Sequence, residues 1–381
     1  MILEIFSIYT QERVGMIKTF KFVQYISEFC GAGTFSIKVP ISEESLKYLD
    51  KKHFILFDND IMGLIRYRKK TTENSSDVEI KGYLLNKLLD WRSFLVTKTF
   101  KGTITEISRN MVDFFFIHNT DARRNIPLIK LATEPEYIPD GASTSMQVTG
   151  KTVRYALESV LNSSGYGYSI VPVIAKYSET LGQTTNISAL SFRVHKPTDR
   201  TIGNTTGNNP VVFSTSMNNL SSSTYTEDDT EYCSTAIVAG EGEGTERTIV
   251  EVGNTEVSGI DRIELYVDAR DLQSDIDENT SMTAEEYKEA LTNRGNSHME
   301  DHASFSSMEG TVIDGASSYV YGRDFFNGDY VSIIDEELGL VASVQITSVS
   351  KSLTESGEKL DMTFGKERVS IQKIVRKRGI V

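Results

Sequence analysis

The feature of the sequence that most limits the fold is a pattern of short alternating segments that occurs twice. In residues 54–82, a buried-type strand, an acidic turn, a second strand, a polar loop and a third alternating strand follow one another. Residues 330–365 repeat this order with longer strands. Alternation with period two predicts β-strands, and the turn residues between them predict antiparallel hairpins. The chain is therefore expected to be mainly β (α+β).

The two patterns have two interpretations. They are either copies of a duplicated β-barrel domain or two antiparallel meanders that look alike, because alternation and turn residues recur in every meander. Duplication would matter for assembly, since two similar barrels in each of three subunits would form a ring of six similar units. The sequence leaves both interpretations open.

Few helices are expected, and capping residues indicate where they begin or end. A serine N-cap predicts a short helix within 42–50. Residues 153–161 carry an apolar face that a glycine at 165 should close. A capping-box pattern of Thr and Glu predicts a helix over 283–291.

The length of 381 residues suggests about two to four domains. We predict, in chain order, a first tube-like antiparallel β-barrel, a middle α+β domain, a second tube-like β-barrel in two pieces, an acidic inserted α+β region between these pieces, and a basic tail. Their residues are, respectively, 1–100, 101–210, 211–245 with 303–372, 246–302, and 373–381.

The acidic excess is confined to one segment. The formal net charge is −13, and residues 227–301 hold 21 acidic and 5 basic side chains, against 32 acidic and 35 basic ones elsewhere. A tight nucleic-acid site neutralises phosphates with Lys and Arg, so this balance argues against gripping DNA. DNA that slides past without specific binding is compatible with it.

One pair of histidines stands at a metal-binding spacing. His298 and His302 are four residues apart, so on a helix they would share a face. The zinc-protease pattern needs Glu directly after the first histidine, and Met299 stands there instead. Because no third ligand is evident, a solvated polar turn is the preferred interpretation, and no metal is predicted.

Other candidate sites are equally weak. The glycine-rich run 240–244 lacks the Lys-Ser/Thr ending of a phosphate loop, and its glutamates would repel phosphate, so it is interpreted as a mobile hairpin tip or lumen-facing loop. No G-x-S-x-G elbow occurs, although a Ser-His-Asp set stays open because triads are spatial. We predict no catalytic, cofactor-binding or metal-binding residue, no cofactor, and no enzyme activity.

Several apolar or sulfur-bearing residues are given structural interpretations. Cys30 and Cys233 are expected to be small buried side chains of a protein made in a reducing compartment. Trp91 and the run 114–116 are expected in cores, although 114–117 could also form a subunit interface. No run is long and apolar enough for a membrane segment, and Glu4 interrupts the first apolar stretch, so no signal peptide is expected.

The ordered set of segments resembles the hub proteins of siphophage tails and related injection machines, and most of all hubs without a catalytic extension. The resemblance covers nearly the whole chain. It rests on IFSIY at 5–9, GTFSIKVP at 33–40, EIKGYLLNKLL at 79–89, TGKTV at 149–153, RIELYVDA at 262–269 and NGDYV at 327–331.

The resemblance implies a structural hub of a phage tail tip or baseplate, located in the virion and made in the bacterial host cytoplasm. It implies a homotrimeric ring with two tube-like β-barrels per chain, which continues the tail tube and leaves a central channel for genome passage. The implied partners are a distal tail or tail tube protein and tip or fibre proteins. Many relatives carry a C-terminal peptidoglycan hydrolase, and this chain stops just after its second barrel pattern, so lytic activity is not expected.

Other interpretations of the function remain open. The chain could be another tail component, such as a distal tail ring or spike-type protein, a tail-associated cell-wall hydrolase, or an unrelated β-rich binding protein. The basic segment 373–378 is either a solvated tail or a segment that docks on a neighbour, for which 227–301 would be a suitable acidic surface.

Overall fold

The computed structural model describes residues 2–58, 60–71, 77–133, 143–162, 164–176, 185–277, 280–312, 319–336, 339–365 and 372–373. Most of the polar loop between the second and third strands of the first pattern lies outside these residues, and so does all of the predicted basic tail except Lys373.

The N-terminal strands form the first part of a 14-stranded sheet. Along the sheet they follow the order β3-β4-β7-β6-β5-β1-β2, and neighbouring strands are antiparallel. Their bounds are β1 Leu3–Ser7, β2 Arg13–Ile17, β3 Phe22–Glu28, β4 Thr34–Pro40, β5 His53–Leu56, β6 Met62–Thr71 and β7 Asp77–Leu84. Helix α1 (Glu43–Tyr48) begins at Ser42, and its capping hydrogen bonds confirm the predicted N-cap.

The C-terminal strands complete the same sheet. Strands β14-β20-β23-β22 follow one another, and β22 then pairs with β3. Strand β21 pairs with β22 and runs parallel to β13, and β24 also pairs with β22. Their bounds are β13 Val212–Ser214, β14 Leu220–Asp228, β20 Phe305–Val312, β21 Tyr330–Asp335, β22 Leu340–Thr354, β23 Gly357–Gly365 and β24 Gln372–Lys373.

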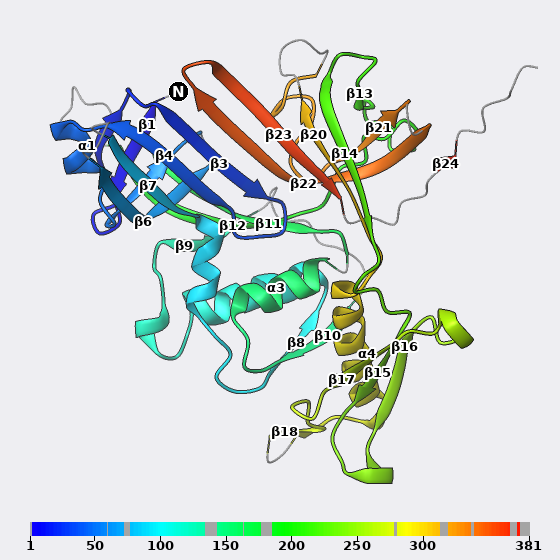
Figure 1. The fold of residues 1–381 in the computed structure, drawn as a ribbon. Helices are drawn as coiled ribbons and strands as arrows, with labels where there is room; N and C mark the ends of the chain where they lie inside the picture. Colours follow the sequence, from blue (N-terminus) through cyan, green and yellow to red (C-terminus); the bar gives the residue numbers. More distant parts are fainter. Residues whose placement is uncertain are drawn as a thin grey trace, which may run out of the picture.

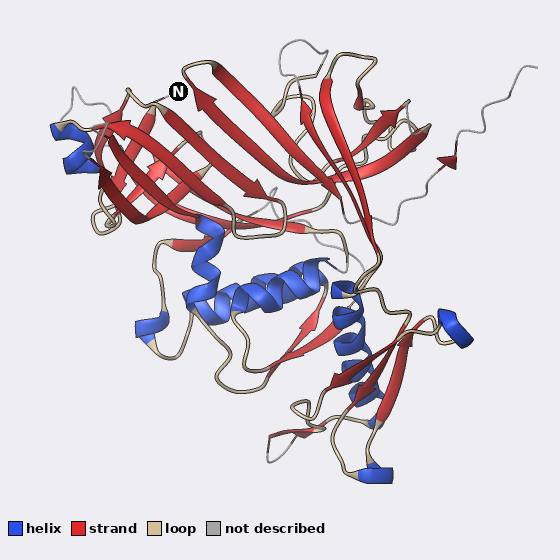
Figure 2. Cartoon of the chain, in the orientation of Figure 1, coloured by secondary structure: helices blue, strands red, loops and turns tan. Residues whose placement is uncertain are grey.

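The two ends of the chain therefore lie side by side in one sheet. In Figure 1 the first strands, in blue, and the last strands, in orange and red, form a single upper layer, with helices α3 and α4 beneath it. Figure 2 makes the division clear, because the upper layer is almost entirely strand. The mainly β fold predicted from alternation is confirmed.

Alternation along the strands builds two separate cores in this layer. On β4, Phe35, Ile37 and Val39 are buried, whereas the residues between them are half-buried or exposed. Side chains from β1 to β7 share one core, and those from β13, β14 and β20 to β23 share another. Each set of strands thus surrounds its own apolar interior, as period-two patterning requires.

A middle region packs under the first half of the sheet. Its helices α2 and α3 and strands β11 and β12 share a core with Phe54 of β5 and Leu64 of β6. Its elements are η1 Leu85–Trp91, β8 Lys98–Gly102, α2 Ile104–Val112, η2 Asp113–Ile117, η3 Ala122–Arg124, β9 Ile129–Leu131, β10 Thr144–Val148, α3 Val153–Asn162, β11 Gly167–Ala175 and β12 Asn186–His195. The helix predicted over 153–161 is confirmed.

A third region lies below β14. In it α4 covers one face of the sheet β16-β15-β17 and contacts β10 of the middle region. The elements are β15 Thr235–Ala239, η5 Gly244–Glu246, β16 Ile249–Gly253, η6 Gly259–Asp261, β17 Glu264–Asp268, β18 Asp275–Asp277, β19 Thr280–Ser281 and α4 Ala284–Asp301. The capping box at Thr283 is confirmed.

Helix α4 is longer than the sequence suggested. It continues to Asp301, so the polar turn predicted around His298 is wrong. The helix lacks a strong apolar stripe beyond Leu291, but Gly295 lets it lie against β15 and β16, because a Cβ there would lie 2.5 Å from a Val238 methyl carbon. Close packing, rather than an apolar pattern, extends this helix.

The two repeated patterns occupy equivalent places in the sheet. In the first, β5, β6 and β7 form an antiparallel meander, and in the second β21, β22 and β23 do the same. Strand β7 then pairs with β4, which pairs with β3, as β23 pairs with β20, which pairs with β14. The second hairpin is longer than the first. Met62, opposite Leu56, therefore corresponds in position to Ser343, opposite Ser332. It does not correspond to the segment near 340, whose sequence is more similar.

Candidate functional site

One face of the large sheet is polar across both halves. Ser36 of β4 lies between Gln24 of β3 and Lys81 of β7 in the strand register. Across the joint with β22, Gln24 Nε2 donates a hydrogen bond to Ser350 Oγ at 3.0 Å. Ser350 in turn lies opposite Asp361 of β23. The row of polar side chains therefore continues from one half of the sheet into the other.

The charges on this face are mixed in sign. Lys81 Nζ lies 2.8 Å from Glu79 Oε1, and Lys359 Nζ lies 2.9 Å from Asp361 Oδ1. Because both pairs are exposed and screened by solvent, they contribute little to stability. Their main consequence is that the face has no strong field of one sign.

The joint between the halves is an antiparallel seam. Residues 22–28 of β3 pair with residues 348–354 of β22. On its core side, Tyr25 Oη donates to Asp58 Oδ2 at 2.6 Å, and Lys351 Nζ lies 3.7 Å from the same oxygen. Burial, and then the neighbouring carboxylate, raise the pKa of Tyr25, so the phenol stays protonated and remains a donor.

The eight-strand run β14-β20-β23-β22-β3-β4-β7-β6 ends in two edges. Strand β14 pairs with β20 on one side and with no other strand in the described part of the chain. Strand β6 pairs with β5 only through residues 62–64, so its later part has one unpaired side among the described residues. Unpaired edges present backbone donors and acceptors that can pair with another chain.

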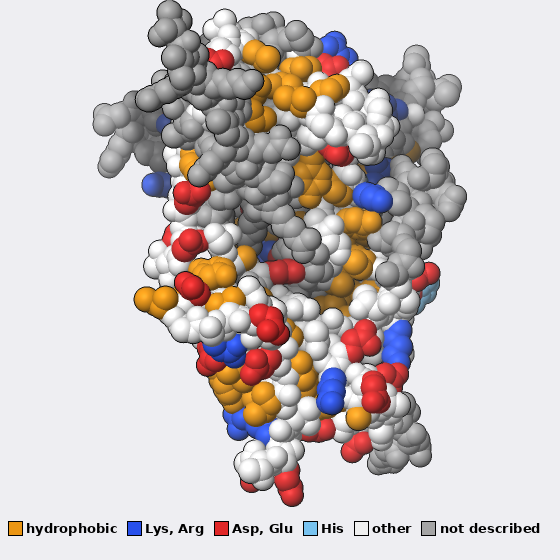
Figure 3. Space-filling model, turned by 90° about the vertical axis from the view of Figure 1, so that its right-hand side faces the viewer, with side chains coloured by type: hydrophobic (Ala, Val, Ile, Leu, Met, Phe, Trp, Pro, Cys, Tyr) orange, Lys and Arg blue, Asp and Glu red, His pale blue; other side chains and the backbone are white. Residues whose placement is uncertain are grey.

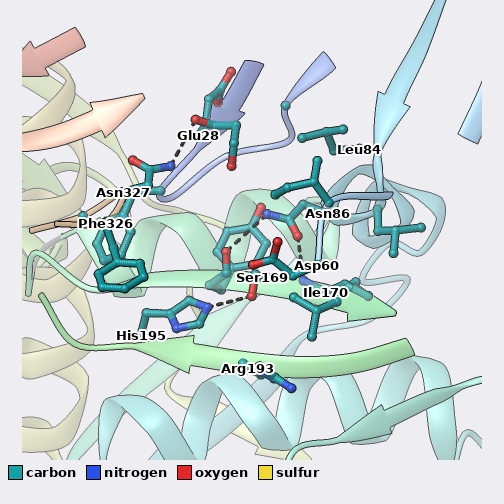
Figure 4. Close-up of a pocket in the computed structure, with 18 of the residues that line it drawn as sticks. Glu28, Asp60, Leu84, Asn86, Ser169, Ile170, Arg193, His195, Phe326 and Asn327 are labelled. Carbon is teal, nitrogen blue, oxygen red and sulfur yellow. Dashed lines mark hydrogen bonds between the residues drawn. The ribbon is translucent and has the colours of Figure 1, made fainter. Parts of the chain in front are cut away.

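A pocket lies beneath the seam, where both halves meet the middle region. Its volume is about 320 Å³, and its walls come from the ends of β3 and β7, from β11 and β12, and from the loop before β21. Asn86 is fully used in holding it: its amide donates to the carbonyls of Gly31 and Tyr168 and accepts from the Ile170 N–H (Figure 4). This side chain ties the sheet to β11.

The pocket contains one arrangement with a catalytic precedent. Ser169 Oγ lies 2.6 Å from His195 Nε2, the distance of a nucleophile–base pair (Figure 4). The sequence could not identify this pair, because the two residues belong to different strands and no motif surrounds either one.

Its electrostatics oppose catalysis. Burial, with Arg193 nearby, lowers the pKa of His195 to about 4, which disfavours the imidazolium that a general base must form. No carboxylate hydrogen bonds to His195 within the described ranges, whereas a triad requires one. The pair is suited to fixing the two strands rather than to acyl transfer.

The structure shows where the histidine pair and the two cysteines lie. In the described part of the chain, no group of three or more His, Cys, Asp or Glu side chains could hold a metal ion. His298 lies on α4, and His302 is its C-cap, with Nδ1 at 3.0 Å from the Glu231 carbonyl oxygen. Cys30 and Cys233 are both half-buried free thiols, rather than the buried side chains expected from the sequence.

One of the two aromatic core predictions is confirmed and the other is wrong. Phe115 and Phe116 are buried in the middle core, as expected, and Phe114 packs against it. Trp91 is 45% exposed, so its assignment to a core is wrong. It ends η1 at the surface, and Arg66 of β6 stacks over its ring at 5.9 Å.

The acidic segment forms the third region, together with the end of β14. The glycine-rich run is the tip of the β15–β16 hairpin, and Glu241 within it accepts hydrogen bonds from the Ser274 N–H. On the sheet face away from α4, Arg262 pairs with Glu251 and Glu264. In the lower part of the view in Figure 3, acidic and basic side chains lie side by side around apolar ones. The local excess of acid is therefore partly neutralised.

Comparison with known families gives one match that spans the chain. The family model described as Siphovirus ReqiPepy6 Gp37-like protein matches residues 2–366. No curated protein sequence matches the chain. Among the described residues, no helix has the length and apolar character needed to cross a bilayer.

Solved structures with a similar fold include three tail proteins. The chain aligns with the prophage tail protein gp18 from Listeria monocytogenes EGD-e at a TM-score of 0.52, with 12% identity over 96% of this chain and 94% of that one. It aligns with the 43 kDa tail protein of prophage MuSo2 from Shewanella oneidensis at a TM-score of 0.55, with 12% identity over 96% and 98%. For the tail protein from Neisseria meningitidis MC58, the TM-score is 0.51, with 13% identity over 96% of both chains.

Proposed function

The chain belongs to the Siphovirus ReqiPepy6 Gp37-like protein family, and from this premise we propose that it is the structural hub of a tail tip or baseplate. The family makes it a phage tail-type protein and a component of the virion. In the proposed role, three copies form a ring that continues the tail tube and surrounds the path of the genome.

The single observation that carries the ring is that both end strands of the eight-strand run, β14 and the later part of β6, have an unpaired side among the described residues. An edge strand is a liability unless it is covered or paired. The two edges belong to different strands, so one copy can join to the next head to tail, and such heterologous contacts close into rings. Two equivalent halves per chain would give three copies the shape of a six-fold tube.

The polar face is assigned to the channel. One face of the run meets the two apolar cores, so the other is left to face water. Its hydroxyls, amides and paired charges would let DNA pass without adsorbing, because the carboxylates beside Lys81 and Lys359 reduce the attraction of these lysines to phosphates. A subset of the acidic residues is proposed to line the channel as well.

The division of the chain into two tube-like β-barrels, a middle α+β domain, an acidic insert and a basic tail is part of this proposal. The two separate apolar cores of the sheet support it. The proposed partners are a distal tail or tube protein on one side and tip or fibre proteins on the other. Synthesis in the host cytoplasm is proposed as well.

A non-enzymatic role is also proposed. The depressed pKa of His195 supports it, since the Ser169–His195 pair is then a weak base–nucleophile couple. Purified protein and its Ser169→Ala variant should leave cell-wall preparations equally turbid. Clearing by the native protein that Ser169→Ala abolishes would replace the structural role with hydrolysis.

Native mass measurement tests the ring. The purified chain should give the mass of three copies, in a concentration-dependent equilibrium with the monomer. A strict monomer over the full concentration range, or a closed six-copy ring, would contradict the proposed trimer. The six-copy result would instead favour a distal tail ring.

A further inference from the structure

The sheet β16-β15-β17 of the third region has one closed face and one open face. On the closed face, Ala236 and Val238 of β15 share a core with Leu291 of α4. On the open face, Ile249 of β16 is 56% exposed and Tyr266 of β17 is 61% exposed. A sheet with apolar side chains on both faces needs a second covering element, because exposed apolar patches mark sites of association.

The apolar side chains of the open face lie next to one another in the strand register. Tyr266 lies opposite Ile237, the central residue of β15, and Ile249 lies opposite Ala239, two residues further along β15. In η6, which leads into β17, Ile260 is 94% exposed. An extended segment laid across this face would therefore meet apolar side chains from all three strands.

The open face is bordered by acidic side chains. On the face itself, Arg262 pairs with Glu251 and Glu264, and Arg247 pairs with Asp268, so these carboxylates are neutralised. Beyond them, four exposed carboxylates in the β15–β16 hairpin tip and in the connection before β17 form no ion pair within the described ranges: Glu243, Glu246, Glu256 and Asp261. The face thus has an apolar centre with negative charge at its two ends.

The chain contains a segment whose composition matches this face. Residues 374–381, with the sequence IVRKRGIV, follow β24 and lie outside the described residues. They include four aliphatic side chains, three basic ones and no acidic one. Complementary charges select the partner of a surface, and apolar contacts add affinity. A second copy of the open face is a less suitable occupant, because it would bring two acidic borders together.

We propose that residues 374–381 dock on the open face of β16-β15-β17. Their aliphatic side chains cover Ile249 and Tyr266, and their cations neutralise the acidic border. Figure 1 shows β24 beside the upper layer and this sheet at the lower end of the molecule, which favours docking on a neighbouring copy. The choice of copy rests on the proposed assembly, whereas recognition of the segment by the face does not.

Binding of a synthetic peptide tests this recognition. The acceptor is the full chain with Arg376→Glu, Lys377→Glu and Arg378→Glu, so that its own segment no longer competes. A fluorescein-labelled peptide of residues 372–381 should bind it, as measured by fluorescence anisotropy. Raising NaCl from about 50 mM to about 500 mM should weaken the binding, because salt screens exposed charges. Failure to bind at low salt would overturn the proposal.

Substitutions on the open face show where the peptide binds. Ile249→Ser and Tyr266→Ser in the acceptor should each raise the dissociation constant by about tenfold, because they remove apolar contacts at the centre of the interface. Ile202→Ser, at a side chain that is 54% exposed and lies outside the third region, is the matched control and should leave it unchanged. The unfolding midpoint shows that each variant is folded. Equal affinities of all three variants would place the peptide elsewhere.

Tryptic cleavage tests the docking in the native chain. Trypsin cuts after Arg376, Lys377 and Arg378, and docking should slow the loss of the last residues, followed by mass spectrometry, about tenfold relative to the free peptide. Ile249→Ser should restore the rate of the free peptide, and Ile202→Ser should not. The slowing should be confined to assembled protein. Slowing in the monomer would overturn the choice of a neighbouring copy, and cleavage of assembled protein at the rate of the peptide would contradict docking.

The proposed ring and this contact can fail separately. A native chain that stays monomeric but still binds the peptide would contradict the ring and retain recognition of the segment by the open face. A trimer that does not bind the peptide would overturn the docking and leave the ring. If the peptide does not bind and Ile249→Ser weakens self-association, the open face belongs to a second copy instead.

Discussion

The two halves of the large sheet have the same strand order but fill it differently. In the first half Gly82 of β7 leaves room, and the Phe35 ring from the neighbouring strand occupies it: a Cβ on Gly82 would lie 2.6 Å from that ring. In the second half the equivalent position of β23 is Phe364, which fills the core itself. The strand order is thus the same in both halves, but the large side chain that fills the core comes from β4 in the first half and from β23 in the second.

The halves also differ outside the shared run. Strand β1 pairs antiparallel with β5, whereas β13 runs parallel to β21. Strand β1 joins the sheet through β5 next to β6, at the end of the run away from the seam, whereas β13 joins through β21 next to β22, the strand that forms the seam. The shared run is the part required to form a continuous wall, and the flanking strands are free to differ because they only complete their own core.

The largest expected effect is in the second core. Phe213 is fully buried, with the rings of Tyr319, Phe325 and Phe364 around it at centroid distances of 5.3 to 6.3 Å. Phe213→Ala should reduce the free energy of unfolding by about 3–5 kcal/mol, measured by urea denaturation. Phe326→Ala, at a side chain that is 45% exposed, should change it by less than about 0.5 kcal/mol. Equal losses would refute the assignment of Phe213 to the centre of this core.

The next effect depends on pH and concerns the pocket below the seam. The folded-state pKa of His195, about 4, lies below its ordinary value of 6.5. The unfolded chain therefore binds the proton more strongly, so stability is full above pH 6.5 and falls between pH 6.5 and 4, by about 3 kcal/mol in total.

His195→Gln should remove this part of the pH dependence, measured as the free energy of unfolding at pH 7 and at pH 4.5. His118→Gln, at an exposed side chain, should retain it. Parallel loss of stability in the native chain and His195→Gln would show that another group is responsible.

A smaller effect sharpens the contrast between Gly82 and Phe364. An added Cβ at Gly82 would lie 2.0 Å from the Leu64 carbonyl oxygen, so the strands must shift. Gly82→Ala should destabilise the protein by about 1–3 kcal/mol in denaturant unfolding. Gly203→Ala, where nothing lies within 4 Å of the new carbon, is the matched control and should be close to neutral.

The smallest effect is at the seam. Gln24→Ala removes the hydrogen bond to Ser350 and should cost about 0.5–1.5 kcal/mol in the same denaturant assay. Ser36→Ala, in the next strand of the same row, should cost less, because no hydrogen bond from its side chain occurs in the described part of the chain. If Gln24→Ala were neutral, the polar row would contribute little to joining the halves.

Much of the fold was predictable because its signals are local. Alternation identified the strands of both meanders, and caps identified the starts of α1 and α4. Helix α2 was not predicted, although Thr103 and Glu106 form a capping box at its start. The end of α4 was missed because it depends on contacts of Gly295 with β15 and β16.

The site was less accessible to sequence reasoning. The seam joins residues more than 300 positions apart, and no local pattern reports such pairing. Exposure of Trp91 could not be read from its type, since a lone tryptophan is usually in a core. The Ser169–His195 pair depends on the register of two strands, which alternation alone does not specify.

The most direct test of the ring is an image of assembled tails, at a resolution that separates strands, with this chain located in the density. The model predicts three copies in a closed ring, the polar sheet face lining the channel, and β6 of each copy beside β14 of the next. A ring in which these two edges face solvent, or in which the polar face points away from the channel, would contradict it.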